Sequence, residues 1–257
     1  MPPRRAVLAA LGAAAGLGGC AAWRAHRALP LDTWVDDGGC PATLAPVLLV
    51  LLTGAHMAPQ EMVQQGFIAA VRQRHLAVDV TVADANLRYA YDGTLLERLH
   101  DDVMAPARAA GWRRIWLGGI SLGGYAALLY AMRHPGAIEG LTLIAPYLGR
   151  PPLLRAIAAA GGPAAWQRTA GPAPAGDIDH ALWHWLAAPP AVMRPIAPPI
   201  WLGYGTEDRL IEGDRLLATL LPADRVATAP GGHDWPPWRA LWARWLDRGL
   251  LPGHCPA

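Results

Sequence analysis

The feature that most constrains how this chain folds is an alternation of short apolar runs and longer amphipathic segments, extending from residue 47 to residue 247. Continuous apolar runs of strand length are typical of strands that are covered on both faces. Strands that alternate with helices form βαβ units, whose strands lie parallel in one sheet. The sequence therefore predicts an α/β fold with a mostly parallel sheet flanked by helices. The expected strands are residues 47–53, 78–83, 114–118, 141–145, 199–204 and 226–229.

The expected helices are residues 59–74, 94–110, 122–133, 212–220 and 236–247. Tryptophans recur at helical spacing near the last of these helices, a pattern that favours core packing over a ligand site. They are Trp235, Trp238, Trp242 and Trp245. A chain of 257 residues, 53% of them hydrophobic, is suited to a single globular domain with a buried core.

One segment, residues 150–198, breaks the alternation. It is rich in Pro, Ala and Gly, and helices are expected near residues 152–160 and 178–187. An insertion at this position is most simply a cap or lid over a functional site. The alternative is an insertion that lies on the surface and has no functional role.

The first nineteen residues have the features of an export signal, with Arg4 and Arg5 ahead of an apolar stretch too short to span a bilayer. The stretch ends in Leu-Gly-Gly-Cys20, which resembles the lipobox of bacterial lipoproteins. That resemblance implies lipidation of Cys20 and a membrane partner through a lipid anchor, at the outer membrane or periplasmic face of a bacterial cell envelope. An ordinary signal peptide or an uncleaved anchor is the alternative. Residues 20–44 are expected to be a tether and residues 45–257 the globular domain.

The two remaining cysteines are Cys40 and Cys255, near opposite ends of the mature chain. Domain termini often lie close together, and an exported protein is in an oxidising compartment. The sequence leaves two alternatives open, a disulfide between them or two free thiols.

The charge distribution argues against nucleic-acid binding, and the positions of the histidines argue against a metal site. The net charge is +2 and basic residues are scattered, so no nucleic-acid partner is predicted. His180 and His184 lie four residues apart, with Asp177 nearby, but the sequence offers no dependable third and fourth ligands. No metal site is therefore predicted.

The strongest chemical signal is Gly119-Ile120-Ser121-Leu122-Gly123, between an expected strand and an expected helix. A Gly-x-Ser-x-Gly motif in this context is typical of a nucleophile elbow, in which a tight turn presents the Ser hydroxyl above the sheet. Ser121 is the only serine in the chain. It is therefore the predicted nucleophile.

A nucleophilic serine needs a base, and His233 is the best candidate among nine histidines. It follows two glycines in the loop after the last expected strand, at the sheet edge where α/β sites lie. The base needs a carboxylate to orient it, and Asp208 at the end of the preceding strand fits best. Glu207 is the neighbouring rival, and Asp234 is too close to His233 in sequence.

Together, the elbow, the Tyr-Gly-Thr-Glu-Asp turn that ends at Asp208 and the Gly-Gly-His-Asp-Trp loop resemble the α/β-hydrolase superfamily, in particular its serine esterases. The ending His-Asp-Trp-Pro-Pro-Trp is also similar to esterase-D-like and acyl-transfer members. The resemblance covers roughly residues 45–248. It implies the α/β-hydrolase fold with a small helical cap insertion, and with the first, antiparallel strands reduced because only residues 30–46 remain to form them.

The resemblance also implies an oxyanion hole made of two backbone amides. The first would belong to Leu122, directly after the nucleophile. The second would come from the loop after an early strand, where Ala55 is the choice and His56 the alternative. The match is partial, because Thr53-Gly54 stands where relatives often carry His-Gly.

The predicted reaction is acyl transfer through a Ser-His-Asp triad, with no metal or organic cofactor. The expected partner is a small-molecule carboxylic ester or thioester with an apolar acyl part. An acyltransferase or a peptidase using the same triad is one alternative. A non-catalytic binding module of the envelope is another.

Overall fold

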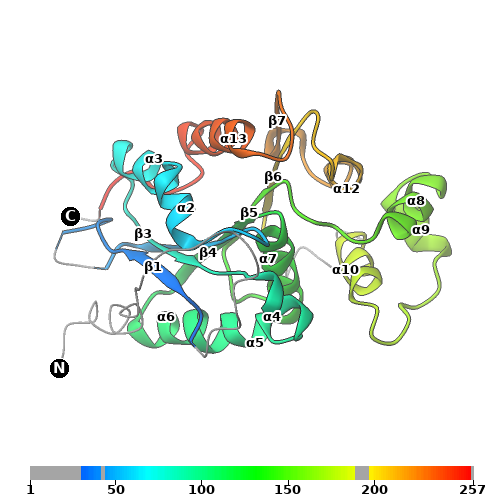
Figure 1. Ribbon diagram of the computed structural model, residues 1–257, viewed down its shortest axis with the longest axis horizontal. Coiled ribbons are helices and arrows are strands. Elements are labelled where there is room, and N and C mark those ends of the chain that lie inside the picture. Colours follow the sequence, from blue (N-terminus) through cyan, green and yellow to red (C-terminus); the bar gives the residue numbers. More distant parts are fainter. Residues whose placement is uncertain (1–29, 42–43, 189–196, 256–257) are drawn as a thin grey trace.

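The computed structural model describes residues 30–41, 44–188 and 197–255, which form a layered α/β structure (Figure 1). Its centre is a seven-stranded sheet with the order β1-β3-β2-β4-β5-β6-β7. The strands are β1 (Thr33–Asp36), β2 (Val47–Leu52), β3 (Val78–Ala83), β4 (Arg114–Ile120), β5 (Gly140–Ile144), β6 (Ile200–Gly205) and β7 (Val226–Ala229). The expected export signal and the expected lipidation site at Cys20 lie outside the described residues.

All neighbouring strands from β3 to β7 pair in parallel. Helices separate them along the chain, as crossover connections require. The prediction of a mostly parallel sheet flanked by helices is therefore confirmed, and each of the six expected strands is present within two residues of its expected ends.

Strand β1 lies within residues 20–44, which were expected to be a tether, and it agrees with the reduced antiparallel strands that the family resemblance implies for residues 30–46. Thr33 pairs with Ala83 and Asp36 with Val80, so that β1 runs antiparallel along the outer edge of β3. Thr, Trp and Val are residues that strands favour, and the edge of β3 supplies unpaired backbone groups. Its exact position could not be read from the local pattern, because the strand has only four residues. In the described part of the chain, the domain thus begins before residue 45.

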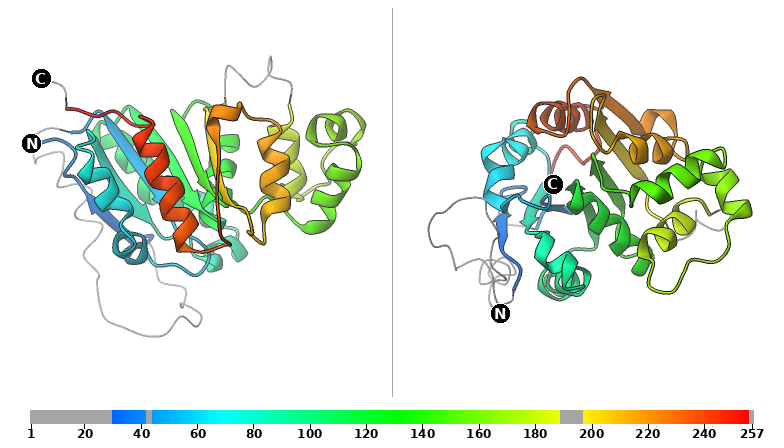
Figure 2. Two further views of the ribbon diagram at one scale, coloured as in Figure 1. Left: turned by 90° about the horizontal axis from the view of Figure 1, so that it is seen from above. Right: turned by 45° about the vertical axis from the view of Figure 1, so that its right-hand side comes forward.

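Helices cover both faces of the sheet, as the two views in Figure 2 show. One face carries α2 (Pro59–Gln64), α3 (Phe67–Gln73) and α13 (Trp235–Asp247). The other carries α4 (Leu87–Tyr91), α5 (Leu95–Leu99), a π-helical turn (His100–Met104), α6 (Ala105–Ala110) and α7 (Leu122–Arg133). Helix α12 (Ile211–Ala218) and a 3₁₀ turn (Ala223–Arg225) connect β6 to β7.

Strand β2 shows why its apolar run is continuous. Alternate side chains along a strand point to opposite faces, and here both faces are core. Val47 and Leu49 pack in the cluster that contains α3 and α13, whereas Leu48 and Val50 pack in the cluster that contains α5 to α7. Every residue of β2 is buried. The expected core role of the tryptophan stripe is confirmed for Trp238, Trp242 and Trp245, and Trp235 packs at its margin.

Two of the predicted helices are interrupted. The helix expected at 59–74 divides into α2 and α3, because Gly66 takes a left-handed conformation with φ 83°. The helix expected at 94–110 contains the π-helical turn, in which the Ala105 N–H donates to the carbonyl of His100. Pro106 has no N–H to continue the regular pattern at this point. Helix α4 was not expected.

The insertion contains three described helices between β5 and β6: α8 (Pro151–Ala159), α9 (Pro163–Thr169) and α10 (Ile178–Leu186). They lie together at one side of the sheet, where α8 contacts α12 and α10 contacts α7 (Figure 1). Two of the three helices were expected within a residue of these bounds. Helix α9, which begins at Pro163, was not expected.

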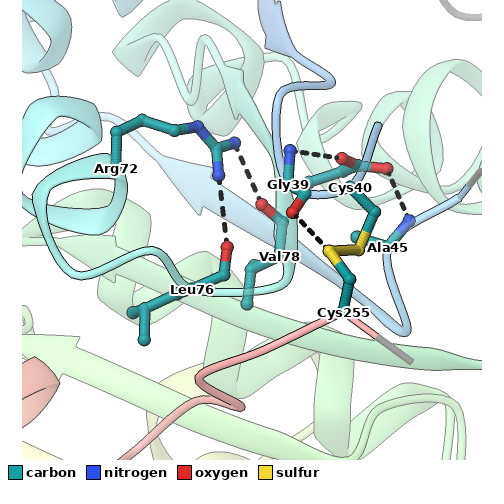
Figure 3. Close-up of a disulfide and its surroundings, with 8 residues drawn as sticks. Gly39, Cys40, Ala45, Arg72, Leu76, Val78 and Cys255 are labelled. Atoms are coloured by element: carbon teal, nitrogen blue, oxygen red, sulfur yellow. Dashed lines mark hydrogen bonds between the residues drawn. A yellow bond between two sulfur atoms is a disulfide. The ribbon is translucent and has the colours of Figure 1, made fainter. Parts of the chain in front are cut away.

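The two ends of the described chain meet at a disulfide between Cys40 and Cys255, with 5.7 Å between the Cα atoms (Figure 3). The Asp79 carboxylate holds the loop that carries Cys40, since it accepts hydrogen bonds from the amides of Gly39 and Ala45. Pro252 ties the other end to the sheet, because its carbonyl accepts the Ala77 N–H. The sequence left open a disulfide or two free thiols, and the structure contains the disulfide.

Within the described residues, none of the helices combines the length and the apolar character that a membrane crossing needs.

Candidate active site

Ser121 lies at a sharp turn between β4 and α7. Its backbone has φ 55° and ψ −114°, a left-handed region that non-glycine residues adopt only when the surroundings hold them there. Three hydrogen bonds hold it: the Ser121 N–H donates to Ile144, and the Ser121 carbonyl accepts the amides of Tyr125 and Tyr147. This strained strand-to-helix turn is the geometry of a nucleophile elbow.

The flanking glycines of the motif are required by close packing of the backbone. A Cβ at Gly123 would lie 2.3 Å from the carbonyl oxygen of Leu52, and a Cβ at Gly119 would lie 2.4 Å from the carbonyl carbon of Gly123. Neither contact is sterically allowed, and both involve backbone that cannot rotate away. The motif therefore closes the turn on itself and brings α7 against the end of β2.

Asp208 follows β6 and His233 follows β7, so both lie beyond the carboxyl ends of neighbouring parallel strands. His233 Nδ1 is 2.9 Å from Oδ2 and 3.0 Å from Oδ1 of Asp208. The Asp208 side chain is fully buried, and its Oδ1 also accepts the Leu210 N–H at 2.8 Å. A carboxylate held in this way fixes the imidazole with a proton on Nδ1 and leaves Nε2 available as a base.

Two further contacts fix the position of the His233 loop. A Cβ at Gly205 would lie 2.3 Å from the Gly231 carbonyl oxygen, so the loop packs directly on the end of β6. The His233 ring packs edge-on against Trp238, with 5.0 Å between ring centroids. The side chain of His233 is consequently only 8% exposed.

The structure brings Asp208 and His233 into contact but does not join Ser121 to them. Ser121 lies beyond the end of β4, at the same edge of the sheet as the other two residues. Among the described residues, no hydrogen bond links Ser121 Oγ to His233. Such bonds are often long before substrate binds. The rival carboxylates, Glu207 and Asp234, are exposed, and within the described residues His233 bonds to Asp208 and to neither of them.

The two amides expected to form the oxyanion hole flank the turn. Leu122 is the first residue of α7, and Ala55 lies in the loop after β2. This loop approaches the turn closely, because a Cβ at Gly54 would be 3.6 Å from the Ile120 carbonyl oxygen. Ala55 is half-buried, whereas the alternative, His56, is exposed.

The histidines of the insertion have partners within the protein. His184 contacts the Gln167 side chain through Nδ1 and the Gly171 carbonyl through Nε2, and His180 Nδ1 lies 3.0 Å from Asp177. In the described part of the chain, no three His, Cys, Asp or Glu side chains form a group able to hold a metal ion.

A buried carboxylate next to the turn was missed by sequence reasoning. Asp179, on α10, accepts a hydrogen bond of 2.6 Å from the Tyr125 hydroxyl and lies 3.5 Å from the Tyr147 hydroxyl. The position of Tyr125, one helical turn after Ser121, could have indicated from the sequence that this tyrosine lies near the turn. Nothing in the sequence pairs it with Asp179, which lies 54 residues further on.

A second buried carboxyl, Asp214 on α12, was also missed. It is fully buried, and neither of its oxygens has a hydrogen-bond partner among the residues that the structure describes. Burial raises the pKa of Asp214 well above its usual value, and the nearby Asp208 raises it further. The carboxyl therefore resists ionisation.

The sheet order, the helices on both faces, and the turn and loops at one edge define an α/β hydrolase. Comparison with known proteins agrees. Residues 62–246 match the model of a family described as "Putative esterase", a span of more than half of the chain. The chain belongs to this family, and it is an esterase-type hydrolase.

Solved structures with the same fold include Est1E from Butyrivibrio proteoclasticus, with a TM-score of 0.57, 14% identity and coverage of 86% of this chain and 92% of that one. A CIB-like hydrolase of Thermoplasma acidophilum has a TM-score of 0.54 and 15% identity, covering 86% and 97%. The fluorophosphonate-binding serine hydrolase FphF of Staphylococcus aureus has a TM-score of 0.52 and 15% identity, covering 80% and 84%. A search of curated proteins found no match. At these identities the structures show a common fold.

Proposed function

We propose that the protein hydrolyses carboxylic esters or thioesters through an acyl-enzyme formed on Ser121, with His233 as general base and Asp208 as the residue that orients it. Ester cleavage agrees with the family. The main observation that supports the mechanism is the hydrogen bond between His233 Nδ1 and the buried Asp208 carboxylate. The pair lies at the edge of the sheet where β4 ends and the strained Ser121 follows.

In the first half of the reaction, His233 Nε2 accepts the Ser121 hydroxyl proton while Oγ attacks the substrate carbonyl carbon. The carbonyl oxygen becomes an oxyanion, for which the amides of Leu122 and Ala55 are the donors that we assign. The protonated His233 then gives its proton to the departing alcohol or thiol. The C–O or C–S bond breaks, and the acyl group remains on Oγ.

In the second half, His233 removes a proton from water, which attacks the acyl carbon. The collapse of this second intermediate returns the proton to Ser121 Oγ and releases the acid. The amino-terminal end of α7, which points its amides at the same place, also favours the negative charge. No step of this scheme needs a metal or an organic cofactor.

The test is the Ser121→Ala variant, compared with wild type in labelling by a fluorophosphonate probe and in turnover of a short-chain aryl ester. We expect labelling and turnover to be lost, because the chain has no other serine. Thr206→Ala, at an exposed hydroxyl in the turn before Asp208, is the matched control and should keep both. Undiminished labelling of Ser121→Ala would contradict the assignment.

The same experiment separates the alternatives. A wild-type protein that labels but transfers its acyl group to an added alcohol or amine in preference to water is an acyltransferase, and cleavage of a peptide panel identifies a peptidase. A folded protein that does not label at all favours a non-catalytic binding role.

We also propose that the protein is exported and anchored by a lipid on Cys20. The Cys40–Cys255 disulfide supports export, because structural disulfides persist in oxidising compartments and are rare in the cytosol. Incorporation of labelled palmitate into wild type but not into Cys20→Ala is the expected result. Equal labelling of the two proteins would argue against the anchor.

A further inference from the structure

Among the contacts that join the segment containing α8 to α10 to the domain core is one buried carboxylate, Asp179. We propose that Asp179 is a positioning residue, which locks helix α10 onto the main chain around Ser121 and so fixes the surface that the insertion offers to substrate. The inference rests on the proposed function of Ser121 and extends it to the control of substrate binding.

Four groups from two parts of the chain, α7 and the segment that follows β5, converge on Asp179. The Tyr125 hydroxyl donates to Oδ1 at 2.6 Å, and the Tyr147 hydroxyl lies 3.5 Å from Oδ2. The Arg150 amide donates to Oδ2 at 3.1 Å, and the Arg150 guanidinium lies 3.4 Å away. The Asp179 side chain is only 8% exposed, so these groups replace the water that a carboxylate otherwise needs.

The two tyrosines are the same residues that hold the nucleophile turn. The amide of Tyr125 donates to the Ser121 carbonyl at 3.1 Å, and the amide of Tyr147 donates to the same oxygen at 3.0 Å. Their rings pack edge-to-face, with 5.1 Å between centroids. Each tyrosine thus joins the Ser121 main chain through its backbone and α10 through its hydroxyl.

The tyrosine hydroxyls keep their protons in this arrangement. Burial, together with the Asp179 carboxylate, raises the pKa of Tyr147 to about 12 and raises that of Tyr125 as well. Both hydroxyls therefore remain protonated hydrogen-bond donors at neutral pH. A short O–H···O⁻ bond of this kind is among the stronger hydrogen bonds in proteins.

The contact is built into the packed face of α10. Trp183 follows Asp179 by one helical turn, is fully buried, and donates its indole N–H to the Leu148 carbonyl at 2.7 Å. Asp177, at the start of the same helix, differs: it caps the helix by accepting the His180 amide and pairs with the exposed guanidinium of Arg150. Asp177 therefore provides a matched control, because it binds α10 and Arg150 but neither tyrosine.

The experiment compares Asp179→Ala and Asp179→Asn with Asp177→Asn in ester hydrolysis and in hydrogen exchange. Ser121, Asp208 and His233 follow strands of the sheet. Ser121 keeps its own hydrogen bond to Ile144, and Asp208 and His233 keep theirs to each other. Losing the Asp179 contact should therefore weaken substrate binding more than it slows the chemical step. We expect the KM of Asp179→Ala to rise by about tenfold or more, the effect of losing one charge-assisted hydrogen bond. We expect smaller changes in kcat, and wild-type constants in Asp177→Asn.

Hydrogen exchange of backbone amides is a measurement that does not depend on enzymatic activity. Amides of residues 178–186 and 121–125 should exchange faster in Asp179→Ala than in Asp177→Asn. Should Asp179→Ala fail to fold, Tyr125→Phe removes the 2.6 Å bond alone and is expected to change KM and exchange in the same direction.

Wild-type KM and wild-type exchange in the Asp179 variants would overturn the proposal. A lower melting temperature with KM and exchange unchanged would also overturn it, since that result assigns Asp179 to stability alone. If wild type does not react with a fluorophosphonate, the proposed function fails, but the exchange comparison still decides whether Asp179 locks α10.

Discussion

His233 Nδ1 lies within 3.0 Å of both carboxylate oxygens of Asp208, although the two residues are 25 positions apart in sequence. The pair connects two loops that leave neighbouring strands, and neither residue has much contact with solvent. In the proposed mechanism, a carboxylate in this position has two roles: it selects the tautomer of the imidazole, and it stabilises the imidazolium that forms during catalysis.

The first prediction concerns this pair. Asp208→Asn keeps the shape of the side chain but replaces the acceptor with a donor on one side, so the imidazole loses the correct tautomer. We expect kcat for ester hydrolysis to fall on the order of 10³- to 10⁴-fold, with little change in folding. Steady-state kinetics and circular dichroism measure the two effects.

Glu207→Gln is the matched control, because Glu207 is the adjacent carboxylate and is exposed. It should retain kcat within about a factor of two, since surface substitutions of this kind have small effects. A large loss of activity in Glu207→Gln, with Asp208→Asn active, would reverse the assignment of the acid.

The second prediction concerns the close approach of α7 to β2. In Gly123→Ala, the new methyl group would lie 2.3 Å from the Leu52 carbonyl oxygen and 2.5 Å from that of Thr53. We expect the free energy of unfolding to fall by about 1–3 kcal/mol, as overpacking usually costs, and activity to fall because the loop carrying Ala55 is displaced. Chemical denaturation and kinetics test both.

Gly171→Ala is the control for Gly123→Ala. Within the described part of the chain, no atom lies within 4 Å of a Cβ at Gly171, and the residue is exposed. Its free energy of unfolding should stay within about 0.5 kcal/mol of wild type. Equal stability of the two variants would show that the packing at Gly123 is looser than the structure describes.

The third prediction is a pH dependence of stability caused by Asp214. Burial raises the pKa of this carboxyl in the folded state, so the folded protein holds the proton more tightly than the unfolded chain. Stability therefore decreases as pH rises from the unfolded pKa through the folded one, by at most about 1.4 kcal/mol per pH unit. Above the folded pKa the loss is complete.

Asp214→Asn has no such proton to lose. The difference in free energy of unfolding between Asp214→Asn and wild type should therefore shift in favour of the variant as pH rises. Urea denaturation at a series of pH values measures it, with Asp224→Asn, at an exposed carboxylate, as the control that should follow wild type. Parallel pH profiles for wild type and Asp214→Asn would show that Asp214 is not buried as described.

The fourth prediction concerns the Cys40–Cys255 disulfide, which closes a loop of 215 residues. Cross-links that close long loops restrict the unfolded chain, so the double variant Cys40→Ser/Cys255→Ser should lose about 2–4 kcal/mol of unfolding free energy. Reduction of wild type should give the same loss, and reductant should not affect the variant. Two titratable thiols in the folded, unreduced protein would contradict the pairing.

The sequence determined most of the secondary structure in the centre of the sheet, because those signals are local. The run of β2 is apolar at every position, and α7 begins directly after Ser121 and was predicted with its observed ends. An antiparallel strand within residues 30–46 was expected only from the family resemblance and not from a local pattern, since the four residues of β1 become a strand only through their pairing with β3. The break at Gly66 likewise depends on one backbone conformation.

The sequence by itself also determined the candidates for the site: a single serine between glycines, and an aspartate and a histidine in the loops that follow later strands. What only the tertiary structure decided is which groups meet. Contacts across 25, 54 and 215 residues, as in Asp208–His233, Tyr125–Asp179 and Cys40–Cys255, depend on how strands are ordered and where loops return. The buried state of Asp214 was decided there too, because desolvation is a property of the packed surroundings and not of the residue.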